Sequence, residues 1–230
     1  QLPLSYPSGS GRGRATKGAA KALLAKVYLT LKDYEKSADK AWEVISSEQY
    51  ELWDDFADVF KYSSRGGKEA VFSVGFGDGG GAISFWEVGQ FNVRLLPAAL
   101  SQEFSNISNT QGWQVATEDL YNAYESDDAR RAITFMTEIV KEDESVVSLD
   151  KIYFRKYWDS EANPNAGGSE NDFQVIRYAD VLLTYAEAQA GQNNFDDANE
   201  YLNKVRNRAN LDDVEINNQA DFFEAVLLER

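Results

Sequence analysis

The fold is decided by residues 174–209, which read QVIRYADVLLTYAEAQAGQNNFDDANEYLNKVRNRA. In the first half of this stretch, side chains recur three and four residues apart as on one face of a helix: Val181, Leu182, Tyr185, Ala186 and Gln189. Gly191 is a natural end for this helix, and Asn194 with Asp197 three residues later is typical of the start of the next one. The second helix repeats the pattern with Phe195, Ala198, Leu202 and Val205. Two helices with so short a connection are expected to lie antiparallel.

These positions follow the alternation of large and small side chains that is typical of a tetratricopeptide helix pair. Ala186 and Ala198 would let the two helix backbones approach closely. A looser copy of the pair is predicted over residues 16–47, where Thr16 and Asp33 are suitable N-caps for its two helices. In the first helix of this copy we expect one apolar face to meet the core: Ala20, Leu23, Leu24, Val27, Tyr28 and Leu31. Trp42 is expected on the core face of the second helix.

Residues 48–173, between the two pairs, have a different character. Residues 70–76 are apolar and rich in β-branched and aromatic side chains, which predicts a buried strand. Residues 132–140 and 152–157 have the same bias and are candidate short strands. The predicted fold is therefore mainly α, with tetratricopeptide-like helix pairs in an α/α superhelix and a large irregular insertion that contains short strands. This insertion, 48–173, is the candidate ligand-binding region.

The last residues, 219–230, predict the start of a further helix that is cut at Arg230. Stacked helical repeats need at least about three units to bury a continuous core. Only two pairs are recognisable here, and the insertion separates them. We therefore expect residues 1–230 to be a single-domain fragment of a longer protein.

The composition excludes several kinds of chemistry. The 230 residues include 23 Lys and Arg and 38 Asp and Glu, and the resulting net charge of −15 argues against nucleic-acid binding. The sequence has no His and no Cys, which excludes a Ser-His-Asp triad, a cysteine nucleophile and a His or thiolate zinc site. Gly77-x-Gly79-x-x-Ala82 has the spacing of a dinucleotide-binding loop, but the residues after it are a poor helix start. We expect no metal, no cofactor and no membrane-spanning segment.

Aromatic side chains beside polar loop residues are the candidate binding residues. A sugar ring has an apolar C–H face and a rim of hydroxyls, so an aromatic ring next to amide or carboxylate groups can recognise it. The aromatic candidates in the insertion are Phe85, Trp86, Phe91, Trp113 and Trp158. The polar candidates are Asn92, Asp159, Asn163 and Asn165. For each aromatic ring the alternative role is packing under its own loop.

Several stretches of the sequence together resemble the SusD/RagB family. The two helical stretches are RATKGAAKALLAKVYL, residues 14–29, and DFQVIRYADVLLTYAEA, residues 172–188. LNKVRNRA at 202–209, EAVFSV at 69–74 and DDAR at 127–130 are also similar to the family, in order and at compatible spacing. The resemblance covers nearly the whole chain.

The resemblance implies a fold and a function. Family members are lipid-anchored proteins on the extracellular face of the outer membrane of Bacteroidetes. They bind glycans, occasionally peptides, and act as the lid of a SusC-like TonB-dependent transporter. They have an α superhelix of tetratricopeptide units and are not enzymes. The lipid anchor would lie outside this sequence, and the family's ligand residues follow no shared motif that could be carried over to it.

Three functions are compared on this basis. The first is a non-catalytic glycan-binding subunit of an outer-membrane SusC/SusD-type nutrient uptake system, which captures oligo- or polysaccharide and delivers it to the transporter. The alternative is a tetratricopeptide adaptor that binds proteins and has no sugar affinity. The third is a carboxylate glycosidase, which needs two carboxylates about 5–9.5 Å apart in a cleft. Nothing in the spacing of the acidic residues favours the glycosidase.

Overall fold

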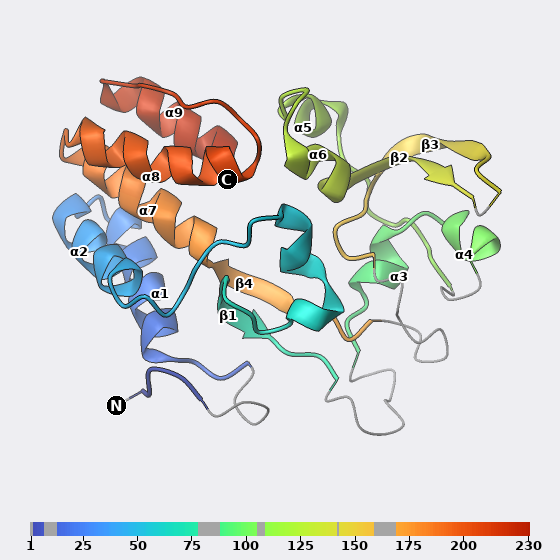
Figure 1. Ribbon diagram of the computed structural model, residues 1–230, viewed down its shortest axis with the longest axis horizontal. Helices are drawn as coiled ribbons and strands as arrows, with labels where there is room; N and C mark the ends of the chain where they lie inside the picture. The colour runs from blue at the N-terminus through green and yellow to red at the C-terminus, as the bar shows by residue number, and fades with distance from the viewer. Residues whose placement is uncertain (1, 7–12, 78–87, 105–108, 142, 159–168) are drawn as a thin grey trace. The chain divides into compact units, whose positions relative to one another are not determined.

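The computed structural model describes all residues except 1, 7–12, 78–87, 105–108, 142 and 159–168. The described chain is mainly helical with a few short strands, as predicted (Figure 1). It divides into two compact units. The first contains residues Gln1–Asp55, Gly66–Val74 and Gln174–Arg230, and the second contains Phe56–Arg65 and Gly75–Phe173.

The long helices all lie in the first unit. They are α1 (Lys17–Thr30), α2 (Tyr34–Ile45), α7 (Tyr178–Gly191), α8 (Phe195–Arg208) and α9 (Gln219–Glu229). α1 packs on α2, α7 on α8, and α2 on α7. Thr16 caps α1 by accepting a 3.1 Å hydrogen bond from the Ala19 amide, and Asp33 caps α2 by accepting from the Lys36 amide at 3.3 Å. Both predicted N-caps are therefore confirmed.

The predicted core face of α7 is confirmed, because all five of its residues are buried. On α8, Ala198, Leu202 and Val205 are buried, while Phe195 is partly buried. Ala186 and Ala198 are both fully buried between the packed helices.

The start of α8 differs from the predicted capping box. Asn194 occupies the N-cap position, but its side chain donates to Gln189 Oε1 at 2.9 Å instead of capping the helix. Asp197 accepts hydrogen bonds from the buried Gln189 amide and from the Tyr185 hydroxyl. The two polar side chains therefore join α8 to α7.

The predicted core face of α1 is wrong. Leu23, Val27 and Leu31 are 58%, 46% and 70% exposed, whereas the buried residues are Ala19, Ala22 and Ala25. The alanines meet the small side chains of α2, whose buried residues include Ser37, Ala38 and Ala41. Small side chains on both helices allow a close approach, and the buried Ser37 hydroxyl donates to the Ala25 carbonyl at 2.9 Å. The leucine and valine side chains are left on the opposite face.

Trp42 also differs from its predicted core position. Its side chain is among the exposed large hydrophobic residues, at 45%. Its ring still lies 5.5 Å from the ring of Tyr185 and 6.2 Å from that of Tyr201. Trp42 therefore covers the edge of the core between α2 and α7.

Two short strands belong mainly to the first unit. β1 (Ala70–Val74), in the predicted position, pairs with β4 (Phe173–Arg177), which leads directly into α7. The loop between α8 and α9 is held by side chains of α8, since Asn199 bonds the backbone of Ile216 and Asn203 bonds the backbone of Val214.

The second unit consists of short elements. It contains the 3-10 helices η1 (Phe56–Phe60) and η2 (Tyr62–Ser64), the helices α3 (Phe91–Leu95), α4 (Leu100–Glu103), α5 (Glu118–Asn122) and α6 (Ala129–Thr134), and the strands β2 (Phe135–Val140) and β3 (Val146–Phe154). β2 and β3 form an antiparallel pair with an irregularity between Met136 and Glu138. Of the candidate strand at 132–140, the first residues complete α6 and only the remainder forms β2. The core under the hairpin contains Leu96, Leu100, Met136, Ile139 and Tyr153.

Among the helices that the structure describes, none combines the length and the apolar character needed to cross a membrane.

Candidate functional site

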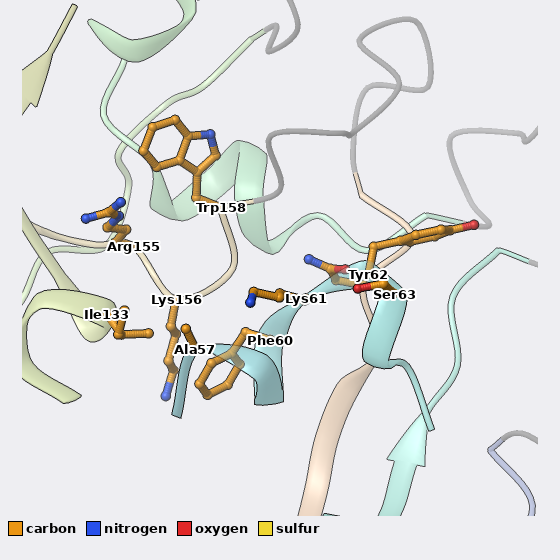
Figure 2. A pocket seen from close by; sticks show the side chains of 10 residues that line it. Ala57, Phe60, Lys61, Tyr62, Ser63, Ile133, Arg155, Lys156 and Trp158 are labelled. Carbon is orange, nitrogen blue, oxygen red and sulfur yellow. The ribbon is translucent and has the colours of Figure 1, made fainter. Parts of the chain in front are cut away.

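A pocket of about 390 Å³ lies within the second unit (Figure 2). It is lined by Ala57, Phe60, Lys61, Tyr62, Ser63, Ile133, Arg155, Lys156, Trp158 and Asn171. Figure 2 shows the indole of Trp158 and the guanidinium of Arg155 toward one side, and Phe60 and Lys61 of the 3-10 helical segment toward the other. The lining therefore joins aromatic, cationic and amide side chains from segments that are far apart in the sequence.

A tight turn after β3 places Arg155, Lys156 and Trp158 at the pocket. The Arg155 amide donates to the Thr134 carbonyl at 2.7 Å, which fixes the turn to the end of α6. The Trp158 amide donates to the Arg155 carbonyl, also at 2.7 Å. Because the turn folds back, the indole of Trp158 and the guanidinium of Arg155 lie together, with the guanidinium carbon 5.2 Å from the ring centroid.

The position of Trp158 is fixed by packing. Its ring meets the Phe104 ring edge to face at 5.6 Å and packs against the core under the hairpin. In that core, burial raises the pKa of Tyr153, and the Tyr153 hydroxyl donates to Asp150 at 3.0 Å. The indole Nε1 of Trp158 is buried and has no hydrogen-bond partner among the described residues. An indole that is fixed in this way at a pocket wall can stack on a ligand ring.

The opposite wall is held by an ion-pair network. The Tyr62 hydroxyl donates to Glu170 Oε2 at 3.0 Å, and Arg65 Nη1 lies 3.3 Å from the same oxygen. The Arg65 guanidinium also lies 3.7 Å above the Tyr62 ring. These contacts fix the orientation of the Tyr62 side chain, which runs away from Trp158 and Phe60 at the edge of the pocket (Figure 2).

Asn171 supplies polar groups to the pocket. Its side chain is only 5% exposed, yet neither Nδ2 nor Oδ1 has a hydrogen-bond partner among the described residues. A buried amide without partners costs about 1–3 kcal/mol, so such groups normally meet water or a ligand. The amide can donate to one ligand hydroxyl and accept from another.

The structure places one of the predicted candidates, Trp158, in the pocket. Phe91 belongs instead to an aromatic cluster, with ring centroids 5.0 Å from Tyr157 and 5.0 Å from Phe173. Trp113 is 64% exposed, and the Arg94 guanidinium lies 4.4 Å from its ring centroid. Asn92 lies in α3, but its side chain is not among those described. The other candidates fall outside the described residues: Phe85, Trp86, Asp159, Asn163 and Asn165.

Sequence reasoning missed most of the pocket. Arg155 and Lys156 were recognisable as a basic pair directly before a loop tryptophan in an otherwise acidic chain. Phe60, Tyr62 and Asn171 carry no such signal, because their contribution depends on contacts between distant segments.

The described residues hold no group of three or more Asp and Glu side chains placed to bind a metal ion. Gly77, the first glycine of the dinucleotide-like spacing, has a positive φ of 57° and a side chain there would meet Glu170 at 2.8 Å. The backbone conformation at residue 77 and its close contact with Glu170 therefore explain why this residue is glycine. The rest of that spacing, from residue 78, falls outside the described residues.

The chain is similar to known proteins along its whole length. SusD-like protein P25 from Formosa agariphila is 30% identical over 261 aligned residues, which cover 98% of this chain and 48% of that protein. The crystal structure of a SusD superfamily protein from Parabacteroides distasonis is 28% identical, with a TM-score of 0.81 over 100% of this chain and 51% of its own. Surface glycan-binding protein A from Bacteroides thetaiotaomicron, solved in complex with laminarihexaose, has a TM-score of 0.81 at 22% identity and shares the fold over 99% of this chain and 54% of its own. The chain spans about half the length of the curated relatives it matches.

The model of the SusD family matches residues 110–230, just over half of the 230 residues. The matched part includes the α7–α8 pair and, in the pocket lining, Arg155, Lys156, Trp158 and Asn171. With the predicted resemblance confirmed in this way, the chain belongs to the SusD family.

Proposed function

We propose that the chain is part of a non-catalytic glycan-binding subunit of an outer-membrane SusC/SusD-type nutrient uptake system. In this role it captures oligo- or polysaccharide and delivers it to a TonB-dependent transporter. The observation that carries the proposal is the pocket, where a fixed indole and a buried amide without a partner among the described residues both form part of the lining. Its lining residues all fall within 48–173, the region that we propose for ligand binding. A sugar ring requires this combination of an apolar face and polar groups.

Two further observations support the proposal. Solved proteins of the same fold include a surface glycan-binding protein in complex with laminarihexaose and a laminarin-binding SusD-like protein. None of the ten lining residues is acidic, whereas a glycosidase uses two carboxylates that flank the scissile bond. A binding role without hydrolysis therefore fits the lining better than catalysis.

The test is isothermal titration calorimetry of the purified chain against a panel of neutral and acidic hexasaccharides. We expect saturable binding of at least one member, with no release of reducing sugar during prolonged incubation. A folded chain that binds no hexasaccharide of the panel would contradict the proposal and favour the tetratricopeptide adaptor. Release of reducing sugar would favour the glycosidase.

The location and the transporter partner are part of the same proposal. We propose that the whole protein is anchored by a lipid to the outer membrane, faces the extracellular side and associates with a SusC-like transporter. Two experiments on the native cells test the location. Cell fractionation shows whether the protein is in the outer membrane, and treatment of intact cells with a protease shows whether it faces the extracellular side. Co-purification of a TonB-dependent transporter with the tagged full-length protein from detergent-solubilised outer membranes tests the partner. A protein that is absent from the outer membrane and that co-purifies with no such transporter would contradict this part of the proposal.

A further inference from the structure

The pocket is cationic in a strongly acidic chain. Lys61, Arg155 and Lys156 line it, and none of the other described lining residues is acidic. The whole chain, in contrast, has a net charge of −15. The cations come from two separate segments, one in the 3-10 helical region and one after β3. The three cations repel one another. A ligand with a negative charge would offset this repulsion and would bind more tightly than a neutral one.

The three cations differ in their partners. Lys61 forms an ion pair with Asp58, one helical turn before it. The Lys156 ammonium lies 5.5 Å from the ring centroid of Phe60 and 5.9 Å from that of Tyr157. Arg155 donates from Nη1 to the Ala132 carbonyl at 3.4 Å and forms no ion pair with a carboxylate of the described residues. Arg155 therefore keeps a guanidinium charge that no described carboxylate neutralises.

The positive charge of Arg155 lies close to the indole of Trp158. The guanidinium lies 5.2 Å from the Trp158 ring centroid, so a ligand ring stacked in the pocket can place a substituent on Arg155. A guanidinium has paired N–H donors in one plane, and these match the two oxygens of a carboxylate or of a sulfate ester. Asn171, buried and without a described partner, remains available for ligand hydroxyls.

We infer that the pocket binds an acidic glycan, with Arg155 and Lys156 receiving the carboxylate of a uronic acid or the sulfate of a sulfated sugar. This inference rests on the proposed function and narrows its ligand class. Trp158 supplies the aromatic surface for the sugar ring, Arg155 and Lys156 supply the charge, and Asn171 supplies the hydroxyl contacts. The cations thus select acidic over neutral sugars of the same size.

Calorimetry with four hexasaccharides tests the inference and distinguishes the two sources of charge. Hexagalacturonate carries carboxylates, a κ-carrageenan hexasaccharide carries sulfates, and cellohexaose and laminarihexaose are neutral. We expect the purified chain to bind at least one acidic ligand at least tenfold more tightly than either neutral one. Raising the salt from 50 mM to 500 mM should weaken only acidic binding, because salt screens the interaction between charges.

A matched pair of variants locates the effect. Arg155→Gln keeps a polar side chain but removes the charge, and we expect it to lose at least tenfold in affinity for the preferred acidic ligand. Arg94→Gln is the control, because Arg94 also lies over a tryptophan, Trp113, but does not line the pocket. It should bind like the unmodified chain. Lys156→Gln provides a second variant if thermal denaturation shows that Arg155→Gln does not fold.

The outcomes separate the two proposals. Neutral hexasaccharides that bind as well as the acidic ones, or an Arg155→Gln variant that keeps full affinity for the acidic ligand, would overturn the inference and leave glycan binding intact. Binding of no hexasaccharide by the folded chain would overturn the inference and count against the proposed function as well. Preference for hexagalacturonate identifies the carboxylate, and preference for the carrageenan ligand identifies the sulfate.

Discussion

Arg208 at the end of α8 and Glu69 just before β1 lie 139 residues apart in the chain, yet Arg208 Nη1 is 2.9 Å from Glu69 Oε2. The two side chains are only 4% and 1% exposed. Arg177 Nη1 donates to Glu69 Oε1 at 2.6 Å, and the Trp53 amide donates to Oε2 at 3.2 Å. The buried carboxylate therefore ties the start of β1 to the ends of β4 and α8.

Glu69→Gln is expected to destabilise the chain strongly. Removing one partner of a buried ion pair leaves the other charge buried without compensation, which costs about 3–5 kcal/mol. Arg208 is more buried than Arg177, so the loss of its ion pair with Glu69 is expected to matter more. The free energy of unfolding, from urea denaturation followed by circular dichroism, measures the effect.

Glu51→Gln is the matched control for Glu69→Gln. Glu51 pairs with Lys68 at 3.3 Å, but its side chain is 72% exposed. Exposed pairs contribute about 0–1 kcal/mol, so this change should be close to neutral. Equal losses in the two variants would show that burial of Glu69 does not determine its contribution.

The same contact shows how far the sequence predicts the fold. The family-like stretches 69–74, 172–188 and 202–209 are separated in the sequence, and Glu69, Arg177 and Arg208 bring them together in the structure. The helices, their caps at Thr16 and Asp33, and the core face of α7 follow from local spacing and are predicted correctly. An ion pair between distant segments has no local signal, so the sequence alone does not reveal it.

The core face of α1 was predicted wrongly for a different reason. α1 carries apolar residues on two faces, one with Ala19, Ala22 and Ala25 and one with Leu23 and Val27. Hydrophobic periodicity favours the face with larger side chains. The structure buries the alanine face, because α2 presents small residues that leave room only for small partners.

Hydrophobicity alone suggests that losing a leucine from α1 lowers the stability of the chain more than replacing an alanine by leucine. We expect the reverse. Ala25→Leu inserts a large side chain where the helices are in close contact, and overpacking of this kind costs about 1–3 kcal/mol. Leu23→Ala removes a side chain that is 58% exposed, and such changes stay within about 0.5 kcal/mol. Urea denaturation of both variants distinguishes the faces, and a larger loss for Leu23→Ala would contradict the observed orientation of α1.

Gly191→Ala is expected to destabilise the chain although alanine favours helices. Gly to Ala in a helix gains up to about 1 kcal/mol. At Gly191, however, an added Cβ would lie 2.4 Å from Cγ of Tyr34. Because Cγ is only two bonds from the α2 backbone, side-chain rotation does little to relieve this contact. The resulting overpacking costs about 1–3 kcal/mol, which exceeds the gain.

A second background isolates the Tyr34 ring as the cause. A Tyr34→Ala chain lacks the three ring atoms that lie nearest to the added Cβ, so Gly191→Ala should there be neutral or stabilising. The difference between the two backgrounds, from thermal denaturation, measures the coupling. The same loss in both would show that Tyr34 is not the obstacle.

The binding site is less predictable than the fold. Trp158 was identified because an indole beside polar loop residues suits a sugar, but the same reasoning also selected Phe91, which packs in an aromatic cluster. Local composition does not distinguish a ring that lines a pocket from one that fills a core. Tyr62 is held beside the pocket by a hydrogen bond to Glu170, which lies 108 residues further along the chain.

Trp158→Ala is expected to weaken glycan binding without unfolding the chain. Loss of a stacked aromatic ring costs about 1–3 kcal/mol of binding energy, which corresponds to about 5- to 150-fold in affinity. Trp53→Ala is the control, because Trp53 lies in the first unit and does not line the pocket. Calorimetry with the best ligand of the panel gives both values, and unchanged affinity in Trp158→Ala would exclude the indole from the site.

Trp113 remains a separate prediction. Its indole is 64% exposed and would be available to a long glycan chain. If it contributes, Trp113→Ala weakens binding of the polysaccharide more than binding of a hexasaccharide, as measured by affinity electrophoresis and calorimetry. No change with either ligand would assign this indole to packing on Arg94.

Glu43→Gln is expected to lower stability at neutral pH but not in acid. Glu43 on α2 accepts a hydrogen bond from Lys21 of α1 at 2.7 Å and one from Lys40, and these contacts, the Lys21 bond foremost, lower the pKa of Glu43 below its usual value near 4.5. A carboxylate with a lowered pKa stabilises the folded chain above its unfolded pKa, and the stabilisation is lost as the pH falls through the folded pKa. Since the side chain is 39% exposed, solvent and salt screen the pairs, and the loss at pH 7 should be under about 1 kcal/mol.

Urea denaturation at pH 7 and at pH 3 checks this, with Glu224→Gln as the control because Glu224 is exposed on α9 and forms no ion pair with a described residue. The difference between the Glu43→Gln variant and the unmodified chain should be present at pH 7, shrink in 1 M NaCl, where the Debye length is about 3 Å, and largely disappear at pH 3. The control should show no such dependence, because its carboxylate has no cation to lose. A difference that persists at pH 3 would mean that Glu43 acts through the packing of its side chain between α1 and α2, and its charge would then have no part in holding the two helices together.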